Sequence, residues 1–301
     1  MKNKTLGIIL AAGTSSRLFP TTMGVTKQLL PIYDKPLIYY PLSTLMLAGI
    51  RDILIITSPK ELHIFERLFK NHELGVNIEF AVQSQPKGIA EAFTIARKHY
   101  GAEIKQYGAT CLILGDNVFY GSGFTGELAY AMKSKSPMLF SIKVKDPERF
   151  GVVEFEKNQH FCSQVTSIEE KPNDPKSHYA ATGLYFYPPS VYEYAEQLQP
   201  STRGELEITD LNNIYVGKGM LNTIIMGRGM SWFDTGTPDA MMQTALFVQT
   251  IQEQQDILVG SPHEVAYTNG WISQEQLIEF ANICGKTKYG EYLLSILGDD
   301  K

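Results

Sequence analysis

The sequence predicts an α/β protein in which helices cover both faces of a mostly parallel, doubly wound sheet. Apolar runs rich in β-branched residues alternate with segments of helical period through the first half of the chain, and this alternation is typical of three-layer α/β folds. The second half contains more strand-like runs, and from Pro238 the pattern turns helical. With 301 residues, of which 44% are hydrophobic, the chain is long enough to bury one large core.

The first half places strands and helices in regular order. Helical period ends at Gly49, and Pro59 is expected to open the next helix. Apolar runs predict strands over residues 5–10, 53–57, 77–82 and 111–114. Periodicity predicts helices over residues 38–48, 59–69 and 89–99.

Two polar segments, 13–17 and 115–117, each follow one of these strands directly. Ligands of open α/β sheets bind beyond the carboxyl ends of the strands. We therefore expect a binding site where these two segments meet.

The second half is expected to add strands and then helices. Alternating patterns predict strands over residues 152–155, 164–168 and 183–187. We expect these strands to form a small mixed sheet that carries part of the site. Residues 274–281 and 289–297 have the period of amphipathic helices.

Composition excludes several classes of partner. The net charge is −5 with no block of like charges, and the pI is about 5.7, so nothing indicates a nucleic-acid or anionic-membrane surface. The three cysteines (Cys111, Cys162 and Cys284) have no C-x-x-C or zinc-type spacing, which favours reduced thiols in the cytoplasm. Because a strand is predicted directly after the first few residues, we expect no leader peptide and no membrane-length apolar run there.

The segment after the first strand has the character of a phosphate-binding loop. It consists of small residues, with Arg17 just beyond it and Lys27 ten residues later. Small residues let backbone N–H groups approach a polyphosphate, and the two cations add full positive charge. Neither G-x-x-x-x-G-K-[ST] nor G-x-G-x-x-G is present, so a P-loop kinase or ATPase is not indicated. The alternative is an ordinary β-to-α turn with two surface cations.

The loop and the run that follows it resemble the sugar-phosphate nucleotidylyltransferases. The run begins Lys27-Gln28-Leu29-Leu30-Pro31 and continues to Ile50, and the likeness recurs in separate motifs nearly end to end. It implies a Rossmann-like nucleotidyltransferase fold. It also implies transfer of a deoxythymidylyl group from dTTP to α-D-glucose 1-phosphate, with release of pyrophosphate. In this reaction the sugar phosphate would attack the α-phosphorus in line, assisted by Mg²⁺. A uridylyl- or cytidylyltransferase, and a non-catalytic nucleotide-sugar-binding protein, remain as alternatives.

The resemblance also implies roles for individual residues. The expected catalytic residues are Arg17, Lys27 and Asp116, and the expected Mg²⁺ ligands are Asp116 and Asp234. The expected nucleotide-binding residues are Leu10, Ala11, Ala12, Gly13, Thr14, Ser15, Gln83 and Gly88. The expected sugar-phosphate-binding residues are Asn117, Gly151, Glu170, Lys171, Gly183, Tyr185, Arg203 and Glu205.

Several of these residues have a plainer interpretation without the resemblance. A lone Asp before Pro238 caps a helix more often than it binds a metal, so Asp234 could be an N-cap. Lys171 and Arg203 lie in charged loops, where such side chains are mostly solvated. Hard carboxylate oxygens nevertheless suit Mg²⁺, and the family motifs favour the functional interpretation.

The base-binding segment departs from the family pattern. Gln83-Ser84-Gln85-Pro86-Lys87-Gly88-Ile89-Ala90-Glu91 has Lys87 in place of an acid and Glu91 in place of a Gln. A Gln amide can pair with both the carbonyl and the ring N–H of a thymine or uracil edge, so Gln83 leaves base selectivity open. Phe150 stands where the family usually has a Tyr, which removes a hydroxyl.

The resemblance further implies a homotetramer and a division of the chain. We expect a core over residues 1–240, with a sugar-binding part at roughly 140–235. A helical region over residues 241–301 is expected to pack on the core and in the oligomer. Relatives commonly have a second nucleotide site with an Arg where this chain has Thr268. Because Thr cannot replace that charge, we expect weak or absent feedback by dTDP-sugars.

Overall fold

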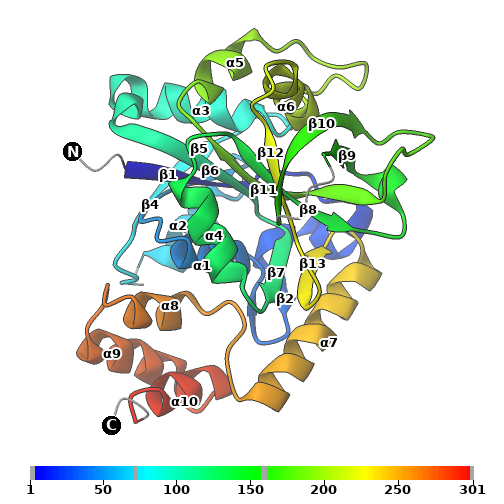
Figure 1. The fold of residues 1–301 in the computed structure, drawn as a ribbon. Coiled ribbons are helices and arrows are strands. Elements are labelled where there is room, and N and C mark those ends of the chain that lie inside the picture. Colours follow the sequence, from blue (N-terminus) through cyan, green and yellow to red (C-terminus); the bar gives the residue numbers. More distant parts are fainter. Residues whose placement is uncertain (1–3, 71–72, 157–160, 299–301) are drawn as a thin grey trace.

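The computed structural model describes residues 4–70, 73–156 and 161–298, and within these ranges the main sheet has nine strands. Its order is β5-β4-β1-β6-β11-β8-β12-β10-β9 (Figure 1). The first four strands of that order run parallel to one another. They are β5 (Asn77–Val82), β4 (Asp52–Thr57), β1 (Lys4–Ala11) and β6 (Tyr107–Leu114). Each overlaps a predicted strand, and the predicted α/β class is confirmed.

The second half of the sheet is mixed. The central strand β11 (Tyr179–Tyr187) runs antiparallel to both β6 and β8 (Met138–Lys143), and β12 (Asn222–Ile225) runs parallel to β8. Antiparallel β10 (Cys162–Glu170) and β9 (Gly151–Phe155) complete the edge. The strands expected over residues 152–155, 164–168 and 183–187, now β9, β10 and β11, were predicted to form a separate small sheet, and instead they extend the large one. Alternation identifies a strand, but it does not say which strand will be its partner.

Two small antiparallel pairs lie outside the main sheet. The first joins β7 (Asn117–Gly121) to β13 (Met230–Asp234), and the second joins β2 (Pro31–Ile32) to β3 (Lys35–Pro36). In the first pair Asp234 stands opposite Asn117. Residues more than a hundred positions apart in the sequence are thereby brought together at the end of β6.

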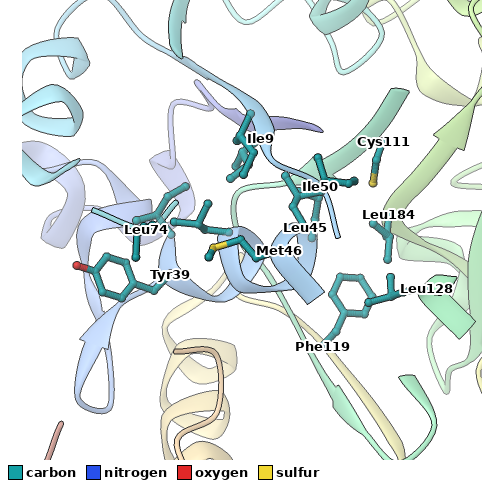
Figure 2. Packing of buried hydrophobic residues seen from close by; sticks show 14 of the residues in the cluster. Ile9, Tyr39, Leu45, Met46, Ile50, Leu74, Cys111, Phe119, Leu128 and Leu184 are labelled. Carbon is teal, nitrogen blue, oxygen red and sulfur yellow. The ribbon is translucent and has the colours of Figure 1, made fainter. Parts of the chain in front are cut away.

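Helices cover both faces of the sheet (Figure 1). Successive residues of β1 point to opposite faces: Ile9 belongs to one apolar cluster and Ile8 to the other. The Ile9 cluster includes α1 (Tyr39–Leu47), α2 (Leu62–Phe69) and α4 (Phe124–Lys133). Figure 2 shows Leu45 and Ile50 beside Ile9 in this cluster. The Ile8 cluster includes α3 (Glu91–Tyr100), α5 (Val191–Gln197) and α6 (Ile208–Gly217).

The C-terminal helices pack below the sheet in Figure 1 and share its core. Leu277 and Leu293 are fully buried in the same cluster as α1. The helices are α7 (Pro238–Gln255), α8 (Pro262–Thr268), α9 (Gln274–Cys284) and α10 (Lys288–Ser295). Short 3₁₀ helices occupy Ser16–Leu18, Thr21–Met23, Lys27–Leu29, Gly101–Gln106 and Pro147–Arg149. The division of the chain at residue 240 stays a prediction.

The helix expected from Pro59 begins only at Leu62, because residues 59–61 form a turn. The helix expected from residue 89 begins at Glu91. Within the described residues, no helix combines the length and apolar character needed to cross a membrane.

Candidate active site

Asp116 and Asp234 meet at the small β7–β13 pair. Thr235 fixes this junction, because its backbone N–H and its hydroxyl both donate to the Asp116 carbonyl, at 3.1 Å and 2.8 Å. The following helix is capped by Thr237, whose side chain accepts from the Ala240 N–H. The alternative that Asp234 caps this helix is therefore wrong. The Asp234 carboxylate is left to face the site, together with that of Asp116.

Lys27 balances only part of this negative charge. Its ammonium is buried and forms an ion pair with the Asp116 carboxylate. Burial would raise the pKa of Asp116, but the charge and hydrogen bond of Lys27 outweigh it and hold that pKa below its usual value. Burial, followed by the charge of Asp116, raises the pKa of Asp234. The paired carboxylates therefore form a buried site that favours a further cation.

Arg17 approaches the same carboxylates from the loop after β1. A Cβ placed on Gly236 would lie 2.8 Å from the Arg17 Nη2 and 3.3 Å from the Asp234 Oδ1. Because residue 236 is a glycine and has no Cβ, the Arg17 guanidinium can occupy this space. Three predicted site residues (Arg17, Asp116 and Asp234) also line one cavity.

A first cavity, of about 520 Å³, lies along the loop after β1 and is called here the nucleotide cavity. Ser15 adopts a positive φ of 52°, which turns the loop. Leu10 does not line this cavity; its carbonyl accepts from the Gly115 N–H at 2.9 Å and so anchors the loop to β6. The predicted nucleotide-binding residues that line the cavity are Ala11, Ala12, Gly13, Thr14, Ser15 and Gln83. Gly88 adjoins it, because its carbonyl accepts from the Gln83 side chain at 3.2 Å.

A second cavity, of about 450 Å³, lies beyond Arg17 and is called here the sugar cavity. Asn117 links two parts of the wall of this cavity. The side-chain oxygen of Asn117 accepts from the Gly183 N–H at 3.1 Å and from the Trp232 indole N–H at 2.6 Å. A Cβ at Gly183 would lie 2.6 Å from that oxygen, so only glycine fits. The predicted sugar-phosphate residues that line the cavity are Asn117, Gly151, Glu170, Lys171, Gly183 and Tyr185.

Arg203 and Glu205 were also predicted for the sugar phosphate, and they lie at the edge of this cavity in a charged cluster. Arg203 donates through Nε and Nη2 to the Glu207 carboxylate, at 3.1 Å and 2.8 Å. Its Nη2 also lies 3.4 Å from Glu170 and 3.9 Å from Glu205. Lys171 contributes a second cation, 3.7 Å from Glu170. The predicted cations are thus already paired with carboxylates.

Comparison with known proteins identifies the family. A model of nucleotidyl transferases matches residues 6–251. The chain is 51% identical over 293 residues to the glucose-1-phosphate thymidylyltransferase of Neisseria meningitidis, covering 97% of this chain and 99% of the relative. It is 47% identical to the Mycobacterium tuberculosis enzyme of the same name, covering 97% and 98%.

The chain belongs to the nucleotidyl transferase family. Solved structures agree with this. A Bacillus anthracis protein in complex with sucrose superposes with a TM-score of 0.70 at 36% identity, covering 81% of this chain and 94% of that one. A UDP-glucose pyrophosphorylase complexed with UDP-glucose shares the fold, with a TM-score of 0.72 at 22% identity, covering 82% and 99%. The predicted family resemblance and fold are confirmed.

Several residues that build this nucleotidyl transferase site were not predicted. Glu207 and Thr209 lie within the charged motif that contains Arg203, and Thr209 donates to Glu170 at 2.6 Å. Trp232 lines the sugar cavity with its ring centroid 5.1 Å from that of Phe150, a residue already expected in the pocket from the sequence. The motif around Arg203 could have drawn attention to Glu207 and Thr209. Trp232 reaches the cavity only through the β7–β13 pairing, which the sequence did not reveal.

The metal-binding potential of the site rests on two carboxylates. Across the described residues, no group of three or more His, Cys, Asp or Glu side chains is arranged to hold a metal ion. Mg²⁺ is commonly bound by one or two carboxylates and completes its shell with substrate phosphate oxygens and water. Asp116 and Asp234 fit that pattern in their oxygen donors and in their number.

Proposed function

We propose that this protein transfers a deoxythymidylyl group from dTTP to α-D-glucose 1-phosphate, giving dTDP-glucose and pyrophosphate. The observation that carries the proposal is the convergence of Arg17, Lys27, Asp116 and Asp234 between two cavities. The nucleotide cavity has the backbone-rich loop expected for a triphosphate. The sugar cavity has polar groups suited to a hexose phosphate. The activity for which the two relatives are named supports the same reaction.

The reaction needs positioning and charge more than proton transfer. A sugar phosphate already bears negative charge, so no general base is required to make it a nucleophile. The obstacle is the approach of two anions, which oriented cations and preorganised donors reduce. Arg17 would bind the triphosphate, while Lys27 would hold Asp116 in place and contribute charge. Asp116 and Asp234 would hold Mg²⁺, which supplies charge neutralisation at the phosphates when bound.

The sugar phosphate would be held by Lys171 and Arg203. Each cation has carboxylate neighbours in the structure, so binding a phosphate requires a partial exchange of partners. Glu170 and Glu205 would then accept hydrogen bonds from sugar hydroxyls. Tyr185 and Gly183 would complete the cavity wall.

The assembly is proposed to be a homotetramer, with the C-terminal helices in subunit contacts. Exposed apolar side chains on α7 and α9 support such contacts, namely Met242, Leu246 and Ile283. Light scattering on the purified chain would measure the mass directly, and a monomeric mass would refute the proposal. The cytoplasm is proposed as the location because the three cysteines are free, as is usual in a reducing compartment.

Initial rates test the reaction itself. The chain would be assayed with dTTP, UTP, CTP and ATP against glucose, galactose and mannose 1-phosphates, with pyrophosphate release as the readout. We expect the highest kcat/KM for dTTP with glucose 1-phosphate. Absence of turnover with every pair, in the presence of Mg²⁺, would overturn the proposal.

A further inference from the structure

The side chain of Gln83 is held in one orientation by the protein. Gln83 directly follows β5, is only 5% exposed, and donates its backbone N–H to Thr57 at 2.9 Å. Its side-chain nitrogen donates to the Glu91 carboxylate at 2.8 Å and to the Gly88 carbonyl at 3.2 Å. Both partners are acceptors, so turning the amide round would place oxygen against oxygen.

This orientation determines what Gln83 offers to the nucleotide cavity. The NH₂ group has two hydrogens, and the two acceptors use both of them. The remaining polar atom is Oε1, and within residues 4–70, 73–156 and 161–298 no donor is hydrogen-bonded to it. Because Gln83 lines the nucleotide cavity, the group left for a ligand is an acceptor.

Gly88 cannot easily change its part of this arrangement. Its φ is +107°, and a Cβ there would lie 2.4 Å from the Leu206 carbonyl oxygen. The Ala90 N–H donates to the Leu206 carbonyl at 3.1 Å, and the Leu206 N–H donates to the Lys87 carbonyl at 2.7 Å. These two backbone hydrogen bonds hold the segment in place. Glu91, at the start of α3, is therefore the adjustable partner of Gln83.

We propose that Glu91 is a positioning residue that sets base selectivity by holding the Gln83 amide with Oε1 toward the base. This inference rests on the proposed function. Thymine and uracil carry a ring N–H at N3, which can donate to Oε1. Cytosine in the same pose carries an unprotonated N3, so two acceptors would face each other. Leaving a desolvated acceptor unpaired lowers affinity by about 10- to 100-fold.

The carboxylate matters because it can only accept. A glutamine at position 91 can donate as well as accept, so it could pair with Oε1 of a rotated Gln83 and leave the NH₂ group facing cytosine N3. The Gly88 carbonyl would still favour the original orientation. We therefore expect Glu91→Gln to reduce the selectivity without abolishing it.

The test compares dUTP with dCTP, which differ only at the base edge that Gln83 would contact. The kcat/KM values with glucose 1-phosphate are measured for the unchanged protein, for Glu91→Gln and for Glu196→Gln. Glu196 lies on α5 and is the exposed ion-pair partner of Arg97, a residue of the helix α3 that also contains Glu91. Its isosteric change is therefore the matched control. We expect the dUTP/dCTP ratio to fall by about tenfold in Glu91→Gln, mainly because dCTP improves, and to stay constant in the control.

The outcomes separate the two proposals. If the unchanged protein turned over neither dTTP nor dUTP, the proposed function and this inference would both fall. If it turned over dTTP but Glu91→Gln kept the ratio within twofold, this inference alone would be overturned. Circular dichroism checks folding. If Glu91→Gln does not fold, Glu91→Asp takes its place, because the shorter side chain withdraws one of the two acceptors that hold the Gln83 amide. We expect it to lower the ratio in the same direction, and an unchanged ratio would overturn the inference.

Discussion

The two sides of the candidate active site are built differently. The nucleotide side uses a short backbone loop after β1, and it meets the sugar side at one buried ion pair, Lys27–Asp116, whose carboxylate lines the sugar cavity. The sugar side uses side chains from several strands and helices, and its cations are paired with carboxylates at the protein surface: the side chain of Arg203 is 40% exposed and that of Lys171 is 49% exposed. Buried, oriented charge acts in a lower dielectric than exposed charge. Substitutions at or beside the buried Lys27–Asp116 pair should therefore reduce turnover, and those among the exposed cations of the sugar side should mainly weaken substrate binding.

The largest effect is expected for Asp116→Asn. This change removes a carboxylate from the expected metal pair and the partner of Lys27, while keeping the shape of the side chain. We expect kcat to fall by at least about 10³ and the Mg²⁺ concentration for half-maximal rate to rise. Steady-state rates over a Mg²⁺ titration would measure both. Near-normal turnover at saturating Mg²⁺ would show that the site is misplaced.

Arg17→Ala should have the next largest effect. It removes a guanidinium that lies beside Asp234 and Gly236, and the loss of one preorganised group costs about 10²–10³ in kcat. The exposed Arg228 offers a matched control, because Arg228→Ala removes the same charge away from both cavities. Equal rates for the two variants would contradict the assignment of Arg17.

Gly88→Ala tests whether the nucleotide side and the sugar side of the site are structurally coupled. The added methyl group would collide with the Leu206 backbone, which continues into the Arg203 loop. Since small displacements of positioning groups can cost up to about 10² in rate, we expect kcat/KM to fall about tenfold or more for both substrates. Gly101→Ala is the control, because Gly101 also has a positive φ but open space around it. A loss confined to one substrate would show that the sides act independently.

Lys171→Ala tests the expectation that substitutions on the sugar side mainly weaken substrate binding. Its ammonium lines the sugar cavity and not the nucleotide cavity. We expect the KM for glucose 1-phosphate to rise about tenfold while the KM for dTTP changes less than twofold, in line with a charge-assisted contact of about 1.4 kcal/mol. Lys176→Ala, at another exposed lysine of the same segment, should change neither value. Equal effects on both substrates would refute the assignment.

The regions of the molecule also differ in how well the sequence predicts them. The parallel half was predictable because continuous apolar runs mark buried strands, and the strand expected over residues 53–57 lies within β4, where these residues are buried. The β7–β13 pair was not predictable, because its register depends on partners more than a hundred residues apart. For the same reason, motifs indicated Asp116 and Arg203 as site residues, whereas the pairing of Arg203 with Glu207 emerged only from the folded chain. The residue roles themselves stay predictions.

Both sides of the active site contain a cation, whereas a third cavity contains none among the described residues that line it. It measures about 310 Å³ and lies between α1, α4 and α8, with Tyr40, Phe124 and Thr268 in its lining. Among the described residues that line it, the one charged side chain is Glu264. A diphosphate would meet a carboxylate there and no guanidinium, so we expect dTDP-glucose to bind at one site per subunit, with no second site.

Isothermal titration with dTDP-glucose measures this stoichiometry, and the expected value is one per subunit for the unchanged protein. Thr268→Arg would place a fork of donors in the cavity, and we expect it to add a second, weaker site. A second tight site in the unchanged protein would show that another cation compensates for Thr268. In that case the third cavity would contain a cation, as both cavities of the active site do, and it would no longer differ from them in this respect.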